Sequence, residues 1–242
     1  MRIRAVVFDW AGTVVDYGCH APAVVLRRIF AQRGIALEPA ECRHAMGMPK
    51  MDQIRAILEL PRVRSQWCTV HGSAPGETIV QELFQAFSAD QLQCIEEHSA
   101  VIPGVPALVE ALRSAGVLIG STTGYSSAIM RKLQPYAARQ GYSPDCVVTP
   151  DDVGSGRPAP WMMFENMRRL NVFPPDAVVK VGDTRPDMQE GRNAGAWCIG
   201  VSASSSDAVL ESEENVRQML LQSGAHYVTA TAAELLPILE EL

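Results

Sequence analysis

Two kinds of hydrophobic pattern divide the chain. Near its start the run Val6-Val7-Phe8 is apolar at every position and stops at Asp9. An uninterrupted apolar run of this length indicates a strand buried on both faces, as in a parallel sheet. From residue 102 onward, short apolar runs alternate with helix-periodic segments, and this pattern predicts further strands over 117–121, 146–148, 177–181, 198–201 and 227–228.

Residues 18–98 carry a different pattern, with helical periodicity and no convincing strand. Apolar residues recur there every three to four positions, which predicts helices over 23–33, 39–45, 51–61 and 78–98. We therefore predict an α/β protein whose core, residues 1–17 and 99–242, is built on a parallel sheet. An all-helical cap domain, residues 18–98, is inserted into it.

Composition narrows the classes of function. The chain has 242 residues, 47% of them hydrophobic, which is enough to bury a substantial core. Its net charge of −6 argues against nucleic acid or an anionic membrane as partner. Six scattered cysteines without a C-x-x-C pair, and no signal-like apolar segment at the start, favour a reducing cytoplasm. No apolar run approaches the roughly 20 residues of a membrane span.

Three of the predicted strands end in polar residues. Asp9 follows the first, residues 121–123 end the second, and Asp183 and Asp187 follow the strand over 177–181. The carboxyl ends of parallel strands meet at one edge of the sheet, where ligands bind. Carboxylates gathered there repel one another unless a cation lies between them, and hard oxygen ligands suit magnesium. The sequence therefore predicts a Mg²⁺ site.

A phosphoryl group explains the remaining polar residues. Thr123 can donate a hydrogen bond to its oxygens, Arg157 can neutralise them, and Asp9 can attack phosphorus in line. A single aspartate after a strand is more often an ordinary turn residue. The combination favours catalysis: D-x-A-G-T, a strand ending in Ser or Thr, a basic residue, and G-D-T-x-x-D, in that order.

This order of motifs resembles the haloacid dehalogenase superfamily, whose phosphotransferases use the first aspartate as nucleophile on a Rossmann-like core. The resemblance covers the whole core, and the helical segment matches the cap that many members insert after the first motif. It implies that Asp9, the backbone carbonyl of Ala11 and Asp183 hold Mg²⁺, with Asp187 nearby. The superfamily's phosphatases usually carry an aspartate at the position of Ala11, to protonate the leaving oxygen, so its absence counts against an ordinary phosphate-ester hydrolase.

Segments along nearly the whole chain are similar to one branch of this superfamily, the phosphonoacetaldehyde hydrolases. They are Asp9-Trp-Ala-Gly-Thr13, Tyr17-Gly18-Cys19, Met46-Gly47-Met48-Pro49-Lys50, Ser121-Thr-Thr-Gly-Tyr125, Thr149-Pro-Asp-Asp152 and Gly156-Arg-Pro-x-Pro-Trp161. In that branch a cap lysine, here Lys50, forms an imine with the substrate aldehyde. The imine accepts the electrons released when the carbon-phosphorus bond breaks, so no oxygen leaving group needs a proton. The resemblance thus implies hydrolysis of phosphonoacetaldehyde to acetaldehyde and phosphate.

The same resemblance implies a set of substrate contacts and an oligomeric state. The implied substrate-binding residues are Thr13, Cys19, Met46, Gly47, Thr123, Tyr125 and Arg157. The branch is typically homodimeric through its cap helices, and the apolar stripe from Val24 to Phe30 could serve that contact.

One residue departs from the branch. Three positions after the lysine the branch has a histidine thought to handle protons, and this chain has Gln53, which cannot titrate. Proton transfer to and from Lys50 then falls to water, Cys19, His20 or His44, or else the substrate differs.

Two other functions remain open. A phosphatase of the same superfamily acting on a small phosphate ester would keep its activity without Lys50. The second is a phosphorylatable, non-catalytic binding protein that acts as a switch. Receiver domains also present acidic strand ends around magnesium, but the helical cap is larger than anything such a switch needs.

Overall fold

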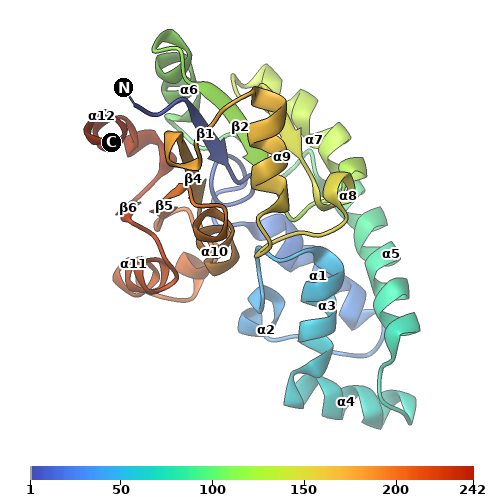
Figure 1. Ribbon diagram of the computed structural model, residues 1–242. Helices are drawn as coiled ribbons and strands as arrows, with labels where there is room; N and C mark the ends of the chain where they lie inside the picture. The colour runs from blue at the N-terminus through green and yellow to red at the C-terminus, as the bar shows by residue number, and fades with distance from the viewer. Residues whose placement is uncertain (1) are drawn as a thin grey trace.

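A six-stranded parallel sheet forms the centre of the computed structural model, which describes residues 2–242. The strands lie in the order β3-β2-β1-β4-β5-β6, and every neighbouring pair is parallel. Their bounds are β1 (Ala5–Phe8), β2 (Leu118–Thr122), β3 (Cys146–Val148), β4 (Val178–Gly182), β5 (Trp197–Val201) and β6 (Tyr227–Thr229). The first strand thus lies in the middle, between β2 and β4 (Figure 1). The predicted parallel α/β core is confirmed.

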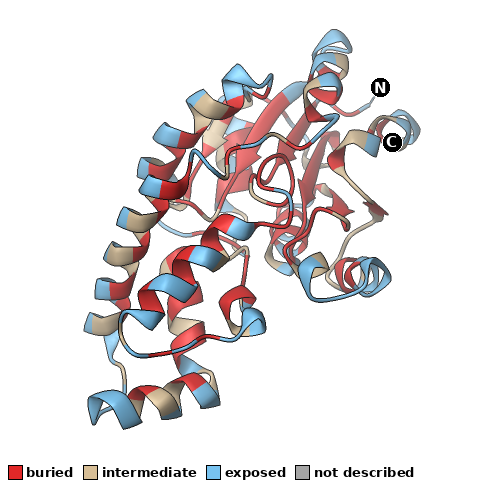
Figure 2. Ribbon diagram, turned by 180° about the vertical axis from the view of Figure 1, so that it is seen from behind, coloured by how far each residue is buried: buried red, intermediate tan, exposed pale blue. Residues whose placement is uncertain are grey.

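Helices cover both faces of this sheet. Alternate residues of β1 point to opposite faces, so Val6 and Phe8 join one hydrophobic cluster while Ala5 and Val7 join another. The first cluster includes α6 (Val105–Ser114), α7 (Ser127–Arg139) and α12 (Leu236–Glu241). The opposite face is covered by α9 (Trp161–Leu170), α10 (Arg185–Asn193) and α11 (Glu213–Gln222). Figure 2 shows the strands almost wholly buried between these layers.

Five helices make up the segment between β1 and α6. They are α1 (His20–Ala31), α2 (Pro39–Arg43), α3 (Lys50–Glu59), α4 (Pro61–His71) and α5 (Glu77–Cys94). Helices α1 and α3 pack on α5, and the group forms a lobe beyond the carboxyl ends of the strands (Figure 1). None of the helices described within residues 2–242 is long and apolar enough to cross a membrane. The cap limits of 18 and 98 stay a prediction.

Two of the α-helices, α4 and α8 (Pro150–Val153), were not predicted. Helix α4 buries only Val63 and Trp67, so its apolar stripe is too sparse to stand out in the sequence. Leu60 is extended at ψ 130°, and Pro61 then starts the new helix, so α3 and α4 are separate. Helix α8 is a single turn that follows β3, capped by the side chains of Thr149 and Asp152.

Two adjacent chain segments connect the helical lobe to the sheet domain. The backbone N–H of Asp16 donates to the carbonyl of Ala100 (3.1 Å), and that of Ile102 donates to Val14 (2.9 Å). The Asp16 carboxylate also lies 3.5 Å from Nδ1 of His98. The outgoing and returning segments are thus hydrogen-bonded to each other where the lobe joins the sheet domain.

The apolar stripe of α1 is largely used inside the lobe. Val25, Leu26, Ile29 and Phe30 are all buried, and Val24 is 43% exposed. Most of the stripe that the sequence offered for a dimer contact therefore packs against the chain's own helices. The homodimer itself stays a prediction.

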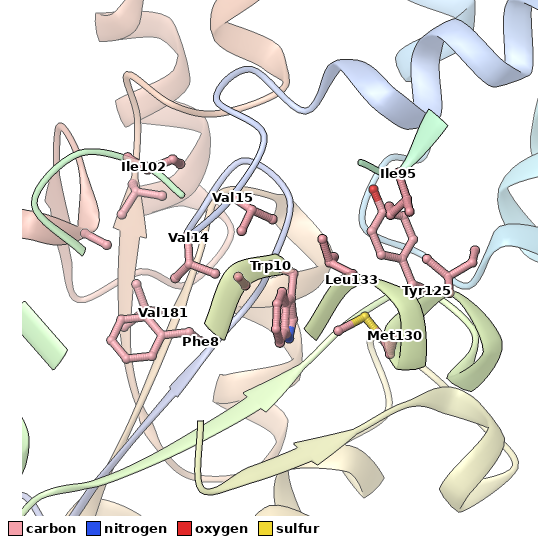
Figure 3. Packing of buried hydrophobic residues seen from close by; sticks show 14 of the residues in the cluster. Phe8, Trp10, Val14, Val15, Ile95, Ile102, Tyr125, Met130, Leu133 and Val181 are labelled. Atoms are coloured by element: carbon pink, nitrogen blue, oxygen red, sulfur yellow. The ribbon is translucent and has the colours of Figure 1, made fainter. Parts of the chain in front are cut away.

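Trp10 anchors the residue next to Asp9 in the core. Its indole is fully buried, lies edge-on to Tyr142 at 5.1 Å between ring centroids, and donates from Nε1 to Oγ of Ser121 (2.8 Å). Figure 3 shows Trp10 among Val14, Leu133 and other members of this cluster. The hydrogen bond joins the end of β1 to β2, so it fixes the turn in which Asp9 stands.

We expect Ser121→Ala to lower the free energy of unfolding by about 1–3 kcal/mol, because the buried indole N–H would lose its acceptor. Urea denaturation followed by tryptophan fluorescence measures the loss. Ser114→Ala, at an exposed position of α6, is the matched control and should change stability by less than about 0.5 kcal/mol. Equal stability of Ser121→Ala and wild type would show that the hydrogen bond does not contribute.

Candidate active site

Three carboxylates meet where β1 and β4 end. Asp9 follows β1 directly and its backbone N–H donates to the carbonyl of Val181 (2.9 Å), so its position is set by the sheet. Asp183 follows β4, and Asp187 lies in the first turn of α10. Each of the three is buried and offers an oxygen within 4.8 Å of the others. The predicted convergence of Asp9, Asp183 and Asp187 is therefore seen in the structure.

The turn after Asp9 presses against Asp183. Gly12 has a φ of +87°, and a Cβ built on it would lie 2.6 Å from Oδ2 of Asp183, so only glycine fits. Thr13 donates from Oγ1 to Oδ1 of Asp183 (3.1 Å), and the backbone N–H of Ser206 donates to Oδ2 (3.1 Å). Thr13 thus orients a carboxylate of the cluster and does not line the cavity described below.

A buried ion cluster surrounds Arg157. Its guanidinium lies 2.7 Å from Asp9, 2.9 Å from Asp187 and 3.1 Å from Glu190. Burial opposes its charge, but these three carboxylates raise the pKa of Arg157 above its ordinary value. Arg157 therefore stays cationic beside Asp9, and its predicted contact with phosphoryl oxygens stays a prediction.

Lys180 and Glu190 complete this cluster, and neither was predicted as part of the site. Nζ of Lys180 lies 2.9 Å from Asp187 and 3.2 Å from Glu190, and it donates to Oγ1 of Thr122 (2.7 Å). Thr122 in turn donates to Glu190 (2.9 Å). A signal was present in the sequence, because a lysine in the middle of a fully buried strand requires a partner there.

Charge balance in the cluster fits a divalent cation. Burial raises the pKa of Asp183 well above its usual range, and the neighbouring carboxylates of Asp9 and Asp187 raise it further. Burial also raises the pKa of Asp9, although Arg157 opposes the shift. Four buried carboxylates, counting Glu190, face two buried cations, so two negative charges lack a partner. A divalent metal ion would balance them, and carboxylate oxygens are ligands that Mg²⁺ prefers.

Lys50 approaches this edge of the sheet from the helical lobe. It is the first residue of α3 and is 5% exposed. Burial lowers the pKa of its amine to about 8, against weaker opposing effects of Cys19 and Asp9. Nζ lies over the ring of Phe87 at 5.9 Å. The amine is therefore far easier to deprotonate than an exposed lysine, whose pKa is near 10.4.

Gln53 holds the amine of Lys50. Its Oε1 accepts a hydrogen bond from Nζ (2.5 Å), while its Nε2 donates to the carbonyl of His44 (3.1 Å). The sulfur of Met46 lies 3.6 Å from both nitrogens. The amide thus positions the Lys50 amine but offers it no group that can take a proton.

Asp9 and Lys50 line the same small cavity. Its volume is about 20 Å³, room for roughly one water. The other lining residues are Ala11, Cys19, Pro22, Met46, Gly47, Thr123, Gly124, Tyr125, Arg157 and Thr184. Except for Thr13, all the residues assigned to the substrate from the sequence border this space.

Close packing of the lobe on the sheet domain explains the small volume. A Cβ on Gly47 would lie 2.2 Å from Oγ1 of Thr184, and one on Gly124 would lie 2.9 Å from the carbonyl oxygen of Met48. A Cβ on Gly156 would lie 2.5 Å from Pro49. Residues 46–49 can rest on the sheet domain only because these positions lack side chains, so the structure shows a closed lobe.

Cys19 and Tyr125 are neutral members of the cavity wall. Burial raises the pKa of both groups well above the ordinary values, and nearby acidic groups add to the shift. Thr123 accepts a hydrogen bond on Oγ1 from the backbone N–H of Tyr125 (3.1 Å), which leaves its own hydroxyl proton available for another acceptor. The wall thus offers hydroxyl and thiol groups beside the cations Lys50 and Arg157.

Comparisons with known proteins show the family to which the chain belongs. A family model described as haloacid dehalogenase-like hydrolase matches residues 3–195. Phosphonoacetaldehyde hydrolase from Bacillus cytotoxicus is 46% identical, over 99% of this chain and 96% of the relative. The enzyme of the same name from Bacillus cereus strain ATCC 10987 is 43% identical, over 100% of this chain and 97% of the relative.

Solved structures give the same result. A phosphonoacetaldehyde hydrolase-like protein from Oleispira antarctica superposes with a TM-score of 0.95 at 32% identity, covering 100% of this chain and 92% of that one. A β-phosphoglucomutase from Clostridium difficile, at 18% identity and a TM-score of 0.75, shares the fold alone. The chain therefore belongs to the haloacid dehalogenase-like hydrolases and, among them, to the phosphonoacetaldehyde hydrolase family.

Proposed function

We propose that this enzyme hydrolyses phosphonoacetaldehyde to acetaldehyde and phosphate. One observation carries the proposal: a lysine amine with a lowered pKa and a buried aspartate border the same small cavity. The first can bind an aldehyde covalently and the second can accept a phosphoryl group. Only a substrate that carries both groups, a short distance apart, uses both residues.

Lys50 acts on the aldehyde. Its neutral amine attacks the carbonyl carbon, and loss of water leaves a protonated imine. The carbon that bears phosphorus is then next to an electron-accepting C=N bond. When the C–P bond breaks, its electron pair moves into an enamine and not onto a free carbanion. Protonation of the enamine and hydrolysis release acetaldehyde and return the amine.

Asp9 acts on phosphorus. Its carboxylate attacks opposite the carbon leaving group and becomes an aspartyl phosphate, which water then hydrolyses to phosphate. No oxygen leaving group forms, so no acid is needed where Ala11 stands. The absence of a carboxylate at Ala11, beside the cavity, supports carbon-phosphorus cleavage over ester hydrolysis.

Asp9, the carbonyl of Ala11 and Asp183 are proposed to hold Mg²⁺, with Asp187 nearby. When bound, the ion supplies positive charge that draws the phosphoryl group and Asp9 together. Arg157 and the hydroxyl of Thr123 are proposed to bind the phosphoryl oxygens. Glu190 forms an ion pair with Arg157, and Lys180 forms ion pairs with Asp187 and Glu190. These contacts fix the positions of Arg157 and Asp187.

The remaining assignments concern the organic part of the substrate. Cys19, Tyr125, Met46 and Gly47 border the cavity beside Lys50 and are proposed to contact it. Thr13 is proposed to act through Asp183, to which it donates a hydrogen bond. A homodimer joined through the helical lobe completes the proposal, on the basis of the family resemblance, and the scattered cysteines favour the cytoplasm as its location.

We expect the wild-type enzyme to release phosphate and acetaldehyde from phosphonoacetaldehyde with Mg²⁺ present and neither with EDTA. Asp9→Asn should lower turnover about ten-thousandfold or more, because an amide is a poor nucleophile. Phosphate and acetaldehyde are measured separately, so that simple phosphate contamination does not count. Release of phosphate by Asp9→Asn at the wild-type rate would remove Asp9 from the mechanism.

We expect borohydride with acetaldehyde or phosphonoacetaldehyde to inactivate the enzyme and to leave a two-carbon adduct on Lys50. The chain has only three lysines, Lys50, Lys132 and Lys180, so peptide mass spectrometry identifies the site directly. Labelling should be slow below pH 8 and reach its plateau above it, because the amine loses its proton with a pKa of about 8.

Lys50→Arg should show neither labelling nor turnover, since arginine keeps the charge but forms no imine. The exposed Lys132→Arg is the matched control and should keep both. Turnover of p-nitrophenyl phosphate that survives in Lys50→Arg, without cleavage of phosphonoacetaldehyde by either enzyme, would support the ester phosphatase instead. A stable phospho-enzyme without product release would support a phosphorylatable switch.

We expect Gln53→His to raise turnover or to move its acid limb toward pH 6.5, because histidine can exchange protons with Lys50. Gln53→Leu keeps the volume but removes the oxygen that holds Nζ, so it should lower turnover about tenfold. Rate profiles from pH 5.5 to 9.5 measure both. An unchanged profile in Gln53→His would show that proton transfer does not pass through this position.

A further inference from the structure

A buried run of serines lies beside the site and has no role in the mechanism above. It spans residues 202–206, Ser-Ala-Ser-Ser-Ser, between the end of β5 and a short 3-10 helix, Asp207–Val209. Its four serines are at most 1% exposed. Buried polar groups need hydrogen-bond partners, and the hydroxyls of Ser202, Ser204 and Ser205 find them in several different parts of the molecule. We call this run the serine loop.

The serine loop touches both Asp183 and the turn after Asp9. Oγ of Ser205 donates to the backbone carbonyl of Asp183 (2.9 Å), and the backbone N–H of Ser206 donates to its Oδ2 (3.1 Å). Oγ of Ser204 donates to the carbonyl of Gly12 (2.6 Å). The loop therefore sets the orientation of a carboxylate in the cluster.

The same loop is joined to the helical lobe and to the segment that leads into it. The carbonyl of Ser204 accepts from the backbone N–H of Gly18 (2.9 Å). Arg43, the last residue of α2, is 8% exposed, and its Nη1 donates to the carbonyls of both Gly18 and Ser206 (2.9 Å each). A cation without a carboxylate partner in these bonds is thus buried between lobe and sheet domain. Burying this charge costs free energy, and its hydrogen bonds to the carbonyls of Gly18 and Ser206 offset part of that cost.

Arg43 stands where the lobe meets the sheet domain. It lines a cleft of about 690 Å³ between α2 and helices α10 and α11. Met46 and Thr184 line this cleft and also the small cavity that holds Asp9 and Lys50. Opening the lobe along this cleft, which a cavity of one water requires for substrate to enter, separates Arg43 from Ser206.

We propose that Arg43 is a latch that couples closure of the lobe to the geometry of Asp183. In the closed lobe its guanidinium holds the carbonyl of Ser206, and the N–H of the same residue holds Oδ2 of Asp183. When the lobe opens, the serine loop loses this restraint and Asp183 loses a fixed donor. Arg43 is thus a positioning residue. The part of the inference that concerns metal binding rests on the proposed function.

The test compares Arg43→Met with Arg185→Met. Arg185 is exposed in the same cleft, so its variant removes the same charge without breaking the latch. We expect Arg43→Met to raise the Mg²⁺ concentration that gives half-maximal thermal stabilisation about tenfold, the usual effect of losing support behind a metal ligand. It should also lower kcat more than it raises KM, while Arg185→Met leaves the Mg²⁺ dependence as in wild type.

Three further variants separate the latch from a general loss of folding. Arg43→Lys keeps a donor and should restore part of the Mg²⁺ response. The two latch contacts of Ser206, with Arg43 and with Asp183, use only its backbone atoms, so Ser206→Ala should keep the Mg²⁺ response of wild type. Ser206 has a φ of −58°, which a proline ring accepts, so Ser206→Pro removes the N–H and should reproduce Arg43→Met.

Hydrogen exchange of the enzyme without Mg²⁺ or substrate gives a readout that does not depend on activity. Amides of residues 202–206 and Gly18 should exchange at least about tenfold faster in Arg43→Met. Unchanged exchange in that variant, or equal changes in Arg185→Met, would overturn the latch. If wild type fails to cleave phosphonoacetaldehyde but the exchange result holds, the proposed reaction fails and the latch stands.

Discussion

The excess of buried negative charge at the ends of β1 and β4 is the constraint on which the site depends. Four carboxylates and two cations share a volume from which water is excluded, so the cluster is stable only when a further cation or proton joins it. The sheet makes this arrangement unavoidable, because Asp9 and Asp183 follow adjacent strands in register. Under the proposed function, a divalent ion bound here would offset this excess charge and, together with Arg157, would allow an anion to bind beside Asp9.

The helical lobe contributes Lys50, an amine whose charged form is disfavoured by burial. Burial of Lys50 lowers its pKa, and that burial exists only while residues 46–49 rest on the sheet domain. The glycines at 47, 124 and 156 are therefore part of the chemistry, since a side chain at any of them would hold the lobe away. Asp9 and Lys50 come from separate parts of the chain, and in this structure both border one cavity.

Most of the site could be predicted from the sequence, because many of its charged and polar residues follow the predicted strands. Asp9, Asp183 and Arg157 lie where the pattern placed them. Lys180 and Glu190 were missed because their role depends on strand register and helix facing, which bring β4 and α10 together behind Arg157. Helix α4 was missed because two buried side chains do not make a readable stripe. The serine loop was missed because short polar runs normally indicate exposed turns.

Closure also determines which form of Lys50 the substrate meets. In an open lobe the amine would be solvated and its pKa would return toward 10.4, so it would carry a charge that attracts the phosphonate. Burial on closure lowers the pKa to about 8 and favours release of that proton. Gln53 fits this sequence of events, because a neutral acceptor can hold the amine in both states without taking its proton. Under the proposed mechanism, one movement of the lobe therefore first captures the anion and then creates the nucleophile.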